Sequence, residues 1–234
     1  MTDRRSIPSP LYLASNSPRR KELMTLSGWT YNVLPAQVDE TPLPDEYGVR
    51  YVQRLAKSKA DHAASHLETD GVVIAADTTV VDCQVDGRTT ILGKPQDHGE
   101  AKDMLLSLRG HAHQVHTAIT ILSTPDGRLI TDLCTTQVPM RHYSDQEIEA
   151  YIASGDPMDK AGAYAIQHSG FHPVDNLEGC YANVMGLPLC HLKRSLYKLS
   201  IFPPADVPQA CQAALAYHCS VYPLILKESI QDYT

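Results

Sequence analysis

Two periods of hydrophobic and polar residues follow one another along the chain, and each predicts a different kind of element. Alternating or continuous apolar runs predict strands, whereas apolar residues that recur every three or four positions predict helices. The expected strands cover residues 11–14, 31–38, 72–76, 77–85, 88–92, 114–123 and 129–139. The expected helices cover residues 18–26, 45–67, 97–110 and 144–155, and a last core helix follows residue 188. Strands and helices therefore alternate over most of the chain.

Short polar signals mark the ends of several of these elements. Asp97 and Ser144 are each followed three residues later by a glutamate, which is the spacing of a helix-capping box. Asp86-Gly87 predicts a two-residue hairpin turn between strands 77–85 and 88–92. Because hairpins lie among alternating strands and helices, we expect an α/β fold whose sheet is mixed rather than purely parallel.

The composition narrows the class of protein. The 234 residues are 43% hydrophobic and 20% charged, which suits a globular protein with a full core. The net charge of −7 argues against general binding of nucleic acid, although a local cluster of cations could still hold a small anion. No apolar run approaches the roughly 20 residues that cross a bilayer, and the N-terminus lacks an apolar signal segment. We therefore expect a cytoplasmic protein without a membrane partner.

The periodic pattern changes after residue 200, where Ile201-Phe202-Pro203-Pro204 interrupts it. We expect one domain over residues 1–200, which the motifs below assign to a family, and a C-terminal extension over residues 201–234. The extension contains a helical pattern, but nothing in it predicts a role. The six cysteines are scattered without a CxxC pair, which favours reduced thiols over a zinc site or a disulfide framework.

Three cationic residues occupy the first turn of the helix expected at residues 18–26, where cations are disfavoured. Ser17 is a good N-cap and Pro18 a good first helical residue, so the positions that follow form the first turn. These are Arg19, Arg20 and Lys21, although the N-terminal end of the helix dipole favours acidic side chains. Free backbone N–H groups, serine hydroxyls and arginine side chains at such a place predict a phosphate site. The alternative is a solvated basic turn.

Asp77 interrupts a strongly apolar strand, VVIAADTTVV. Burial of an unpaired carboxylate is costly, so Asp77 is expected to face a cation, a metal ion or a cleft; a structural ion pair is the alternative. With a two-residue turn at residues 86–87, Lys94 would lie opposite Thr79 and diagonal to Asp77 on the same face. This arrangement would place an acid and a base together, as a metal–phosphate site requires.

Lys59 lies at the centre of the apolar stripe of the helix expected at residues 45–67, whereas Lys57 lies off that stripe. The apolar residues of the stripe are Val52, Leu55, Ala56 and Ala63. Two interpretations stay open. Lys59 is either directed at a phosphate or reaches solvent from the edge of the core.

Five short segments carry a resemblance to a known family. They are LASNSPRR at residues 13–20, ADT at 76–78, GKP at 93–95, DKAGAYAIQ at 159–167 and VMGLP at 184–188. In this order and spacing, over about residues 11–199, the set resembles the Maf family of nucleotide pyrophosphatases. Two departures are Cys180, where the family often has a serine before the tyrosine, and the length of the chain beyond residue 200.

The resemblance implies a reaction and a fold. The reaction is hydrolysis of a nucleoside triphosphate to the monophosphate and pyrophosphate. The fold is elongated and similar to that of inosine triphosphate pyrophosphatases, with two lobes around a central mixed sheet and a cleft between them. The resemblance also implies a divalent cation, Mg²⁺ or Mn²⁺, and a homodimer.

The family's motifs also imply roles for particular residues. The triphosphate would be contacted by Ser15, Arg19, Arg20, Lys59 and Lys94. Glu40 and Asp77 would hold the metal ion, and Asp77 would also be the general base. Together with these two acids, Lys94 would make up the catalytic set.

Two positions point to a subgroup of the family. Thr78 follows the catalytic aspartate and Gln167 ends the Gly-Ala-Tyr motif, which resembles the group that hydrolyses dTTP and UTP; Arg19 would be the third position that matters for this choice. A glutamine amide can donate to and accept from the edge of a pyrimidine. The alternatives are a 7-methyl-GTP pyrophosphatase and a non-catalytic nucleotide sensor in cell division. A sensor has no need of Asp77 and Glu40, so an enzyme is favoured.

Overall fold

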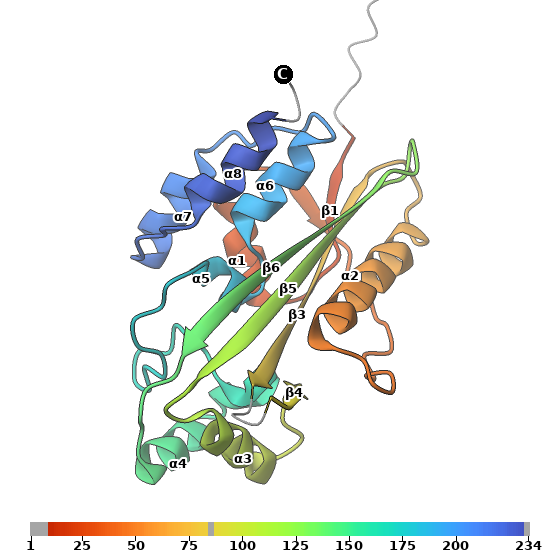
Figure 1. The fold of residues 1–234 in the computed structure, drawn as a ribbon. Coiled ribbons are helices and arrows are strands. Elements are labelled where there is room, and N and C mark those ends of the chain that lie inside the picture. Colours follow the sequence, from red (N-terminus) through yellow and green to blue (C-terminus); the bar gives the residue numbers. More distant parts are fainter. Residues whose placement is uncertain (1–8, 84–86, 232–234) are drawn as a thin grey trace, which may run out of the picture.

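The computed structural model describes residues 9–83 and 87–231 (Figure 1). Its strands are β1 (Leu11–Leu13), β2 (Tyr31–Val33), β3 (Val72–Cys83), β4 (Thr89–Leu92), β5 (Ala112–Ser123) and β6 (Leu129–Pro139). Its helices are α1 (Pro18–Thr25), α2 (Gly48–Ala64), α3 (His98–Leu108), α4 (Asp145–Ala153), α5 (Tyr181–Met185), α6 (Leu189–Tyr197), α7 (Val207–Leu215) and α8 (Tyr222–Gln231). Two short 3₁₀ turns, η1 (Asp156–Asp159) and η2 (Ala161–Ala163), lie between α4 and α5.

The strands form one mixed sheet, as the hairpins in the sequence predict. The order is β2-β1-β3-β5-β6, and β4 pairs with β3. β1 runs parallel to β2 and β3, whereas the β3–β4, β3–β5 and β5–β6 pairs are antiparallel. On the side of β3 away from β5, β1 covers residues 72–74 and β4 covers residues 80–83. Among the described residues, the stretch 75–79 has no strand on that side, and it contains Asp77 and Thr78.

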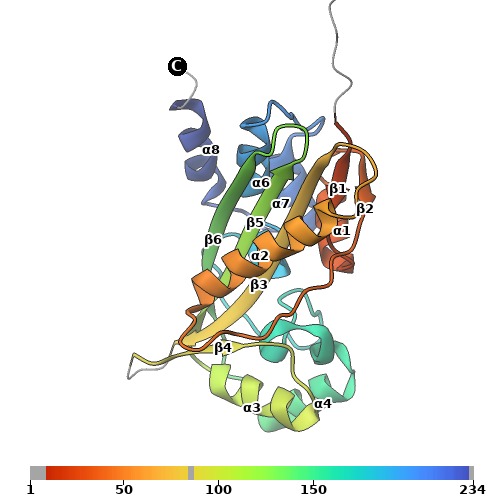
Figure 2. The same cartoon turned by 90° about the vertical axis from the view of Figure 1, so that its right-hand side faces the viewer.

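Helices cover both faces of this sheet (Figures 1 and 2). Alternate side chains of β3 point to opposite faces. Ile74 packs in a cluster with Leu23 of α1 and Leu192 of α6, whereas Val73 packs with Ala60 of α2. A strand buried on both faces reads as a continuous apolar run, which is the pattern of residues 72–76.

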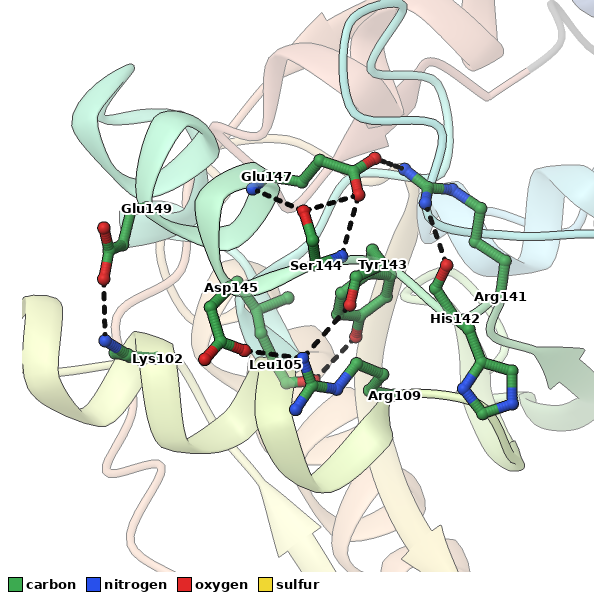
Figure 3. A network of polar contacts seen from close by, with 10 residues as sticks. All are labelled: Lys102, Leu105, Arg109, Arg141, His142, Tyr143, Ser144, Asp145, Glu147 and Glu149. Atoms are coloured by element: carbon green, nitrogen blue, oxygen red, sulfur yellow. Dashed lines mark hydrogen bonds and ion pairs between the residues drawn. The ribbon is translucent and has the colours of Figure 1, made fainter.

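α3 and α4 form a smaller lobe at the far end of the long strands (Figure 2). They share an apolar core with β5, β6 and the 3₁₀ turns. Polar contacts tie the two helices together (Figure 3): Arg109 donates to Asp145 at 2.7 Å, and the Tyr143 hydroxyl donates to the Leu105 carbonyl at 2.7 Å. The expected two-lobed α/β architecture is therefore present.

The hairpin register predicted from a two-residue turn is wrong by one residue. Cys83 pairs with Thr89, whereas a two-residue turn at residues 86–87 would pair it with Thr90. Asp86 of the predicted turn lies outside the described residues. β4 ends at Leu92, so Lys94 follows it in a loop and does not face Thr79 across a hairpin.

Other elements differ in extent. The strand expected at residues 31–38 ends at Val33, and the chain then continues as a loop that carries Glu40. The short helix α5 was not predicted. The C-terminal region contains two helices, α7 and α8, which pack against α6.

Candidate active site

A cavity of about 320 Å³ lies beside residues 75–79 of β3, the stretch that has no strand on the side away from β5. Its walls come from the β1–α1 junction, β3, residues 159–167 and the end of α5. All nine residues predicted to form the site line this one cavity: Ser15, Arg19, Arg20, Glu40, Lys59, Asp77, Thr78, Lys94 and Gln167. The topology explains why they meet, because β1 delivers the start of α1 to the same edge where β3 lacks a neighbouring strand.

The start of α1 has the form that its sequence predicts. The Ser17 side chain caps the helix by accepting from the Arg20 backbone N–H at 3.4 Å, and Ser15 Oγ accepts from the Ser17 N–H at 3.2 Å. The first turn contains no acidic residue. Among the described residues, no hydrogen bond or ion pair engages the Arg19 side chain. A helix start that carries unpaired positive charge into a cavity favours an anionic ligand.

Arg20 is held in a fixed orientation. Its Nε donates to the Gly186 carbonyl at 2.8 Å and its Nη2 donates to the Thr78 hydroxyl at 3.1 Å. Thr78 in turn lies 2.9 Å from the Thr117 hydroxyl, which donates to the Asn183 carbonyl. Burial lowers the pKa of Arg20, although the nearby Asp77 charge acts in the other direction. Two uncharged acceptors thus orient the guanidinium, and its positive charge is available to an anionic ligand.

Lys59 joins the two predicted acidic residues. Its Nζ lies 2.6 Å from Asp77 Oδ1 and 2.6 Å from Glu40 Oε1. Lys59 and Asp77 are 8% and 5% exposed, whereas Lys57 is exposed and pairs with Asp61. The position of Lys59 in the apolar stripe therefore reflects a buried ion pair instead of a chain that reaches solvent.

The two carboxyl groups respond differently to the same lysine. Burial raises the pKa of Asp77, and the charges of Lys59 and Arg20 only partly offset that effect. Burial also acts to raise the pKa of Glu40, but the hydrogen bond and charge of Lys59, together with Lys94 and Arg20, outweigh it and lower that pKa. The difference follows exposure, because the Glu40 side chain is 47% exposed and Asp77 is nearly covered. Asp77 is thus the stronger proton acceptor of the two.

Cations outnumber acids around the cavity. Five cationic side chains line it, against three acidic ones. The protein as a whole is negative, so this local excess marks the cavity as a site for an anion. Lys94 reaches the cavity from its loop, and no hydrogen bond or ion pair engages its side chain among the described residues.

The sequence did not assign a role to Lys160, which is 8% exposed and lines the cavity. Its Nζ donates to Asp159 Oδ1 at 2.6 Å and to the Asp156 carbonyl at 2.5 Å. The signal that pointed to it was the segment DKAGAYAIQ, in which it stands second. Gly186 likewise stands in a family segment, VMGLP at residues 184–188, but the sequence gave no sign that its carbonyl accepts from Arg20.

The fold and the cavity define the class: an α/β protein whose mixed sheet opens onto a cationic cavity with a buried carboxylate. The chain belongs to the Maf-like protein family, whose family model matches residues 10–199. Within the part of the chain that the structure describes, no helix is long and apolar enough to cross a membrane.

Two relatives are named dTTP/UTP pyrophosphatase. The protein of Nitrosomonas europaea is 45% identical, with 82% of this chain and 95% of the relative covered. The protein of Alkaliphilus metalliredigens is 41% identical, with 80% and 95% covered. Among solved structures, the Ham1 protein of Staphylococcus aureus aligns at a TM-score of 0.38 and 18% identity, with 56% of this chain and 71% of that chain covered.

Proposed function

We propose that this protein hydrolyses dTTP and UTP to the monophosphate and pyrophosphate. The observation that carries the proposal is the cavity, in which an excess of cations surrounds the buried carboxylate of Asp77. The names of the two relatives support the choice of substrate. We further propose that residues 1–200 form the catalytic domain and residues 201–234 an extension to it.

The cations bind the triphosphate. A triphosphate carries up to about four negative charges, which must be neutralised before a nucleophile approaches. Arg19 and Lys94 have no hydrogen bond or ion pair with the described residues and are available to phosphate oxygens. Arg20 presents the rest of its guanidinium to the cavity, and Ser15 adds a hydroxyl at the helix start. Interactions that strengthen as the pyrophosphate departs lower the barrier of the reaction.

Asp77 acts as the general base. Its raised pKa makes it a better proton acceptor than an exposed carboxylate, and it remains close enough to Lys59 to be held in one orientation. A water molecule beside Asp77 gives up a proton to the carboxylate and attacks the α-phosphorus. The bond from the α-phosphorus to the bridging oxygen breaks, and pyrophosphate leaves with the electron pair of that bond.

The donor set suits a divalent cation bound together with the nucleotide. Mg²⁺ in nucleotide sites is held by one or two carboxylates plus phosphate oxygens, and Asp77 and Glu40 supply two carboxylates. Both now bond to Lys59 Nζ, a positive charge at the place where the two acids converge. Among the described residues, no group of three or more His, Cys, Asp or Glu side chains could hold a metal ion alone. Mg²⁺ or Mn²⁺ bound there would neutralise phosphate charge and acidify a coordinated water.

Thr78 and Gln167 select the base. Gln167 lines the cavity, and its amide can both donate to and accept from a pyrimidine edge. The Thr78 hydroxyl accepts from Arg20, so Thr78 affects selection by fixing this arginine. A homodimer remains a prediction of the family resemblance.

Pyrophosphate release from dTTP, UTP, CTP, GTP, ATP and 7-methyl-GTP, measured with Mg²⁺ or Mn²⁺, tests the proposal. We expect kcat/KM to be highest for dTTP and UTP. A preference for 7-methyl-GTP would keep the reaction and overturn the role of Thr78 and Gln167. Triphosphate binding without release of pyrophosphate from any of the six would instead support a nucleotide sensor.

A further inference from the structure

The C-terminal segment, here residues 201–231, lies beyond the part of the chain that matches the family model. It folds back onto the catalytic domain. The Ala205 N–H donates to the Ser27 carbonyl and Trp29 Nε1 donates to the Phe202 carbonyl, so the start of the segment is attached near α1. Val207 belongs to the same apolar cluster as the residues of α6. The segment is thus an integral part of the folded protein.

Tyr217, between α7 and α8, reaches across to the loop that leads into α5. Its hydroxyl lies 3.2 Å from the Gly179 N–H, 3.0 Å from the Gly179 carbonyl and 2.9 Å from the Leu177 carbonyl. A phenol has one proton to donate, so it accepts from the amide and donates to one carbonyl at a time. Its ring also contacts the Tyr181 ring, with centroids 5.4 Å apart. One side chain therefore holds the main chain of this loop.

Gly179 lets the loop lie close to the sheet. A Cβ at this position would come within 2.8 Å of the Thr136 side chain on β6. The loop is therefore confined between β6 on one side and Tyr217 on the other. Loss of the Tyr217 hydroxyl would leave the Gly179 amide without this acceptor.

The loop leads directly to the wall of the cavity. α5 begins at Tyr181, and its five residues span only about 7.5 Å. Its last residues and Gly186 line the cavity, and the Gly186 carbonyl orients Arg20. Asn183, whose amide donates to the Val115 carbonyl and to Thr136, fixes the middle of the helix. Tyr217 fixes its entrance, so the two anchors together set where Gly186 lies.

We propose that Tyr217 is a positioning residue, through which the C-terminal segment braces α5 and so aligns Arg20 with the triphosphate. The inference rests on the proposed function. It gives the extension a role in substrate binding, although none of residues 201–231 lines the cavity.

The test compares Tyr217→Phe with Tyr222→Phe. Tyr222 lies in the same segment and is also partly buried, but its hydroxyl bonds to no described residue. For Tyr217→Phe we expect KM for dTTP to rise about two- to tenfold, the range that one lost hydrogen bond produces, with kcat within about twofold. Amide hydrogen exchange in residues 177–186 should quicken by a similar factor. Tyr222→Phe should change neither quantity.

A merely structural role would lower the active fraction and hence kcat, with KM unchanged. That result, or faster exchange in residues 177–186 without a change in KM, would overturn the proposal. Should Tyr217→Phe fold poorly, Gln212→Ala replaces it, because Gln212 Oε1 accepts from the Cys219 N–H and so fixes the turn that carries Tyr217. The same rise in KM is expected, and an unchanged KM overturns the proposal.

The proposal and the proposed function can fail separately. If the unaltered protein releases no pyrophosphate from any triphosphate, the proposed function fails. Pyrophosphate binding, measured by calorimetry, then replaces KM. A dissociation constant about two- to tenfold higher for Tyr217→Phe than for Tyr222→Phe would still support the positioning role of Tyr217, and equal constants would overturn it.

Discussion

The cavity and the α3–α4 lobe place charged side chains in opposite ways. In the lobe, charges pair at the surface: Lys102 Nζ lies 3.0 Å from Glu149, and Arg109 Nη1 lies 2.7 Å from Asp145 (Figure 3). Helix α4 there begins with a complete capping box, and acids occupy its first turn. These charges are paired with one another and this helix start is capped, so neither needs a ligand to complete it.

Around the cavity the local preferences are broken. The first turn of α1 is cationic, and a lysine and an aspartate are buried together. Such charges cost free energy when they leave water, and a buried pair is weak evidence for stability. A polyanion would use these charges, whereas nothing in the lobe would respond to one. The contrast separates residues that build the fold from residues that serve the ligand.

The largest expected difference between the two regions is in kcat, when one carboxylate is removed from each. Asp77→Asn should lower kcat about 10²- to 10⁴-fold, because a general base typically contributes that much. Asp145→Asn, the same chemical change at a surface pair, should leave kcat within about twofold. Steady-state hydrolysis of dTTP measures both. Near-normal turnover in Asp77→Asn would remove Asp77 from the mechanism.

The pH dependence of stability should also differ between the regions. Burial raises the folded pKa of Asp77, so its contribution to stability is present below the unfolded pKa of about 3.9 and is lost as pH rises through the folded value. Asp77→Asn should therefore raise the urea midpoint at pH 7, with a smaller gain near pH 4. An unchanged or lower midpoint at pH 7 would show that the ion pair with Lys59 outweighs burial.

The pKa of Glu147, in the lobe, is shifted in the opposite direction from that of Asp77. Its hydrogen bonds to Arg141 and to Ser144 lower its pKa to about 2. Its contribution is present above the unfolded pKa of about 4.3 and is lost as pH falls toward 2. Glu147→Gln should thus lower the urea midpoint at pH 7 and have less effect near pH 3. The two substitutions, measured side by side, should shift the midpoint in opposite directions at neutral pH.

Elements whose ends are marked by side-chain chemistry could be predicted from the sequence. Asp97 and Ser144 cap α3 and α4 as their spacing indicated. The hairpin register could not be predicted, because it depends on the length of the loop between the paired residues, and a slip of one position changes every pair. α5 could not be predicted either, since it is only five residues long and is held by contacts of Asn183 with distant strands.

The same division applies to the site. Asp77, Lys59 and the cations of α1 could be found because each breaks a local rule at its own position in the sequence. Lys160 is buried among acids one and four residues away, which is an ordinary local pattern. The Tyr217 hydroxyl bonds to main-chain groups of Leu177 and Gly179, and the Gly186 carbonyl accepts from Arg20. In both cases the partners lie far apart in the sequence, so only the folded chain brings out these roles.

The smallest expected effect lies in the lobe. Ser144→Ala removes the side chain that accepts from the Glu147 N–H at 3.3 Å, and loss of an N-cap costs about 1 kcal/mol. For a chain of this size that corresponds to a fall in Tm of about 2–4 °C, which calorimetry would detect. We expect KM for dTTP to stay unchanged, because no residue of α4 lines the cavity. The other half of α4 does touch a cavity segment, since the Tyr151 hydroxyl accepts from the Ala165 N–H. A change in KM in Ser144→Ala would therefore mean that the helix transmits the loss of its cap through Tyr151, and that the lobe belongs to the binding machinery after all.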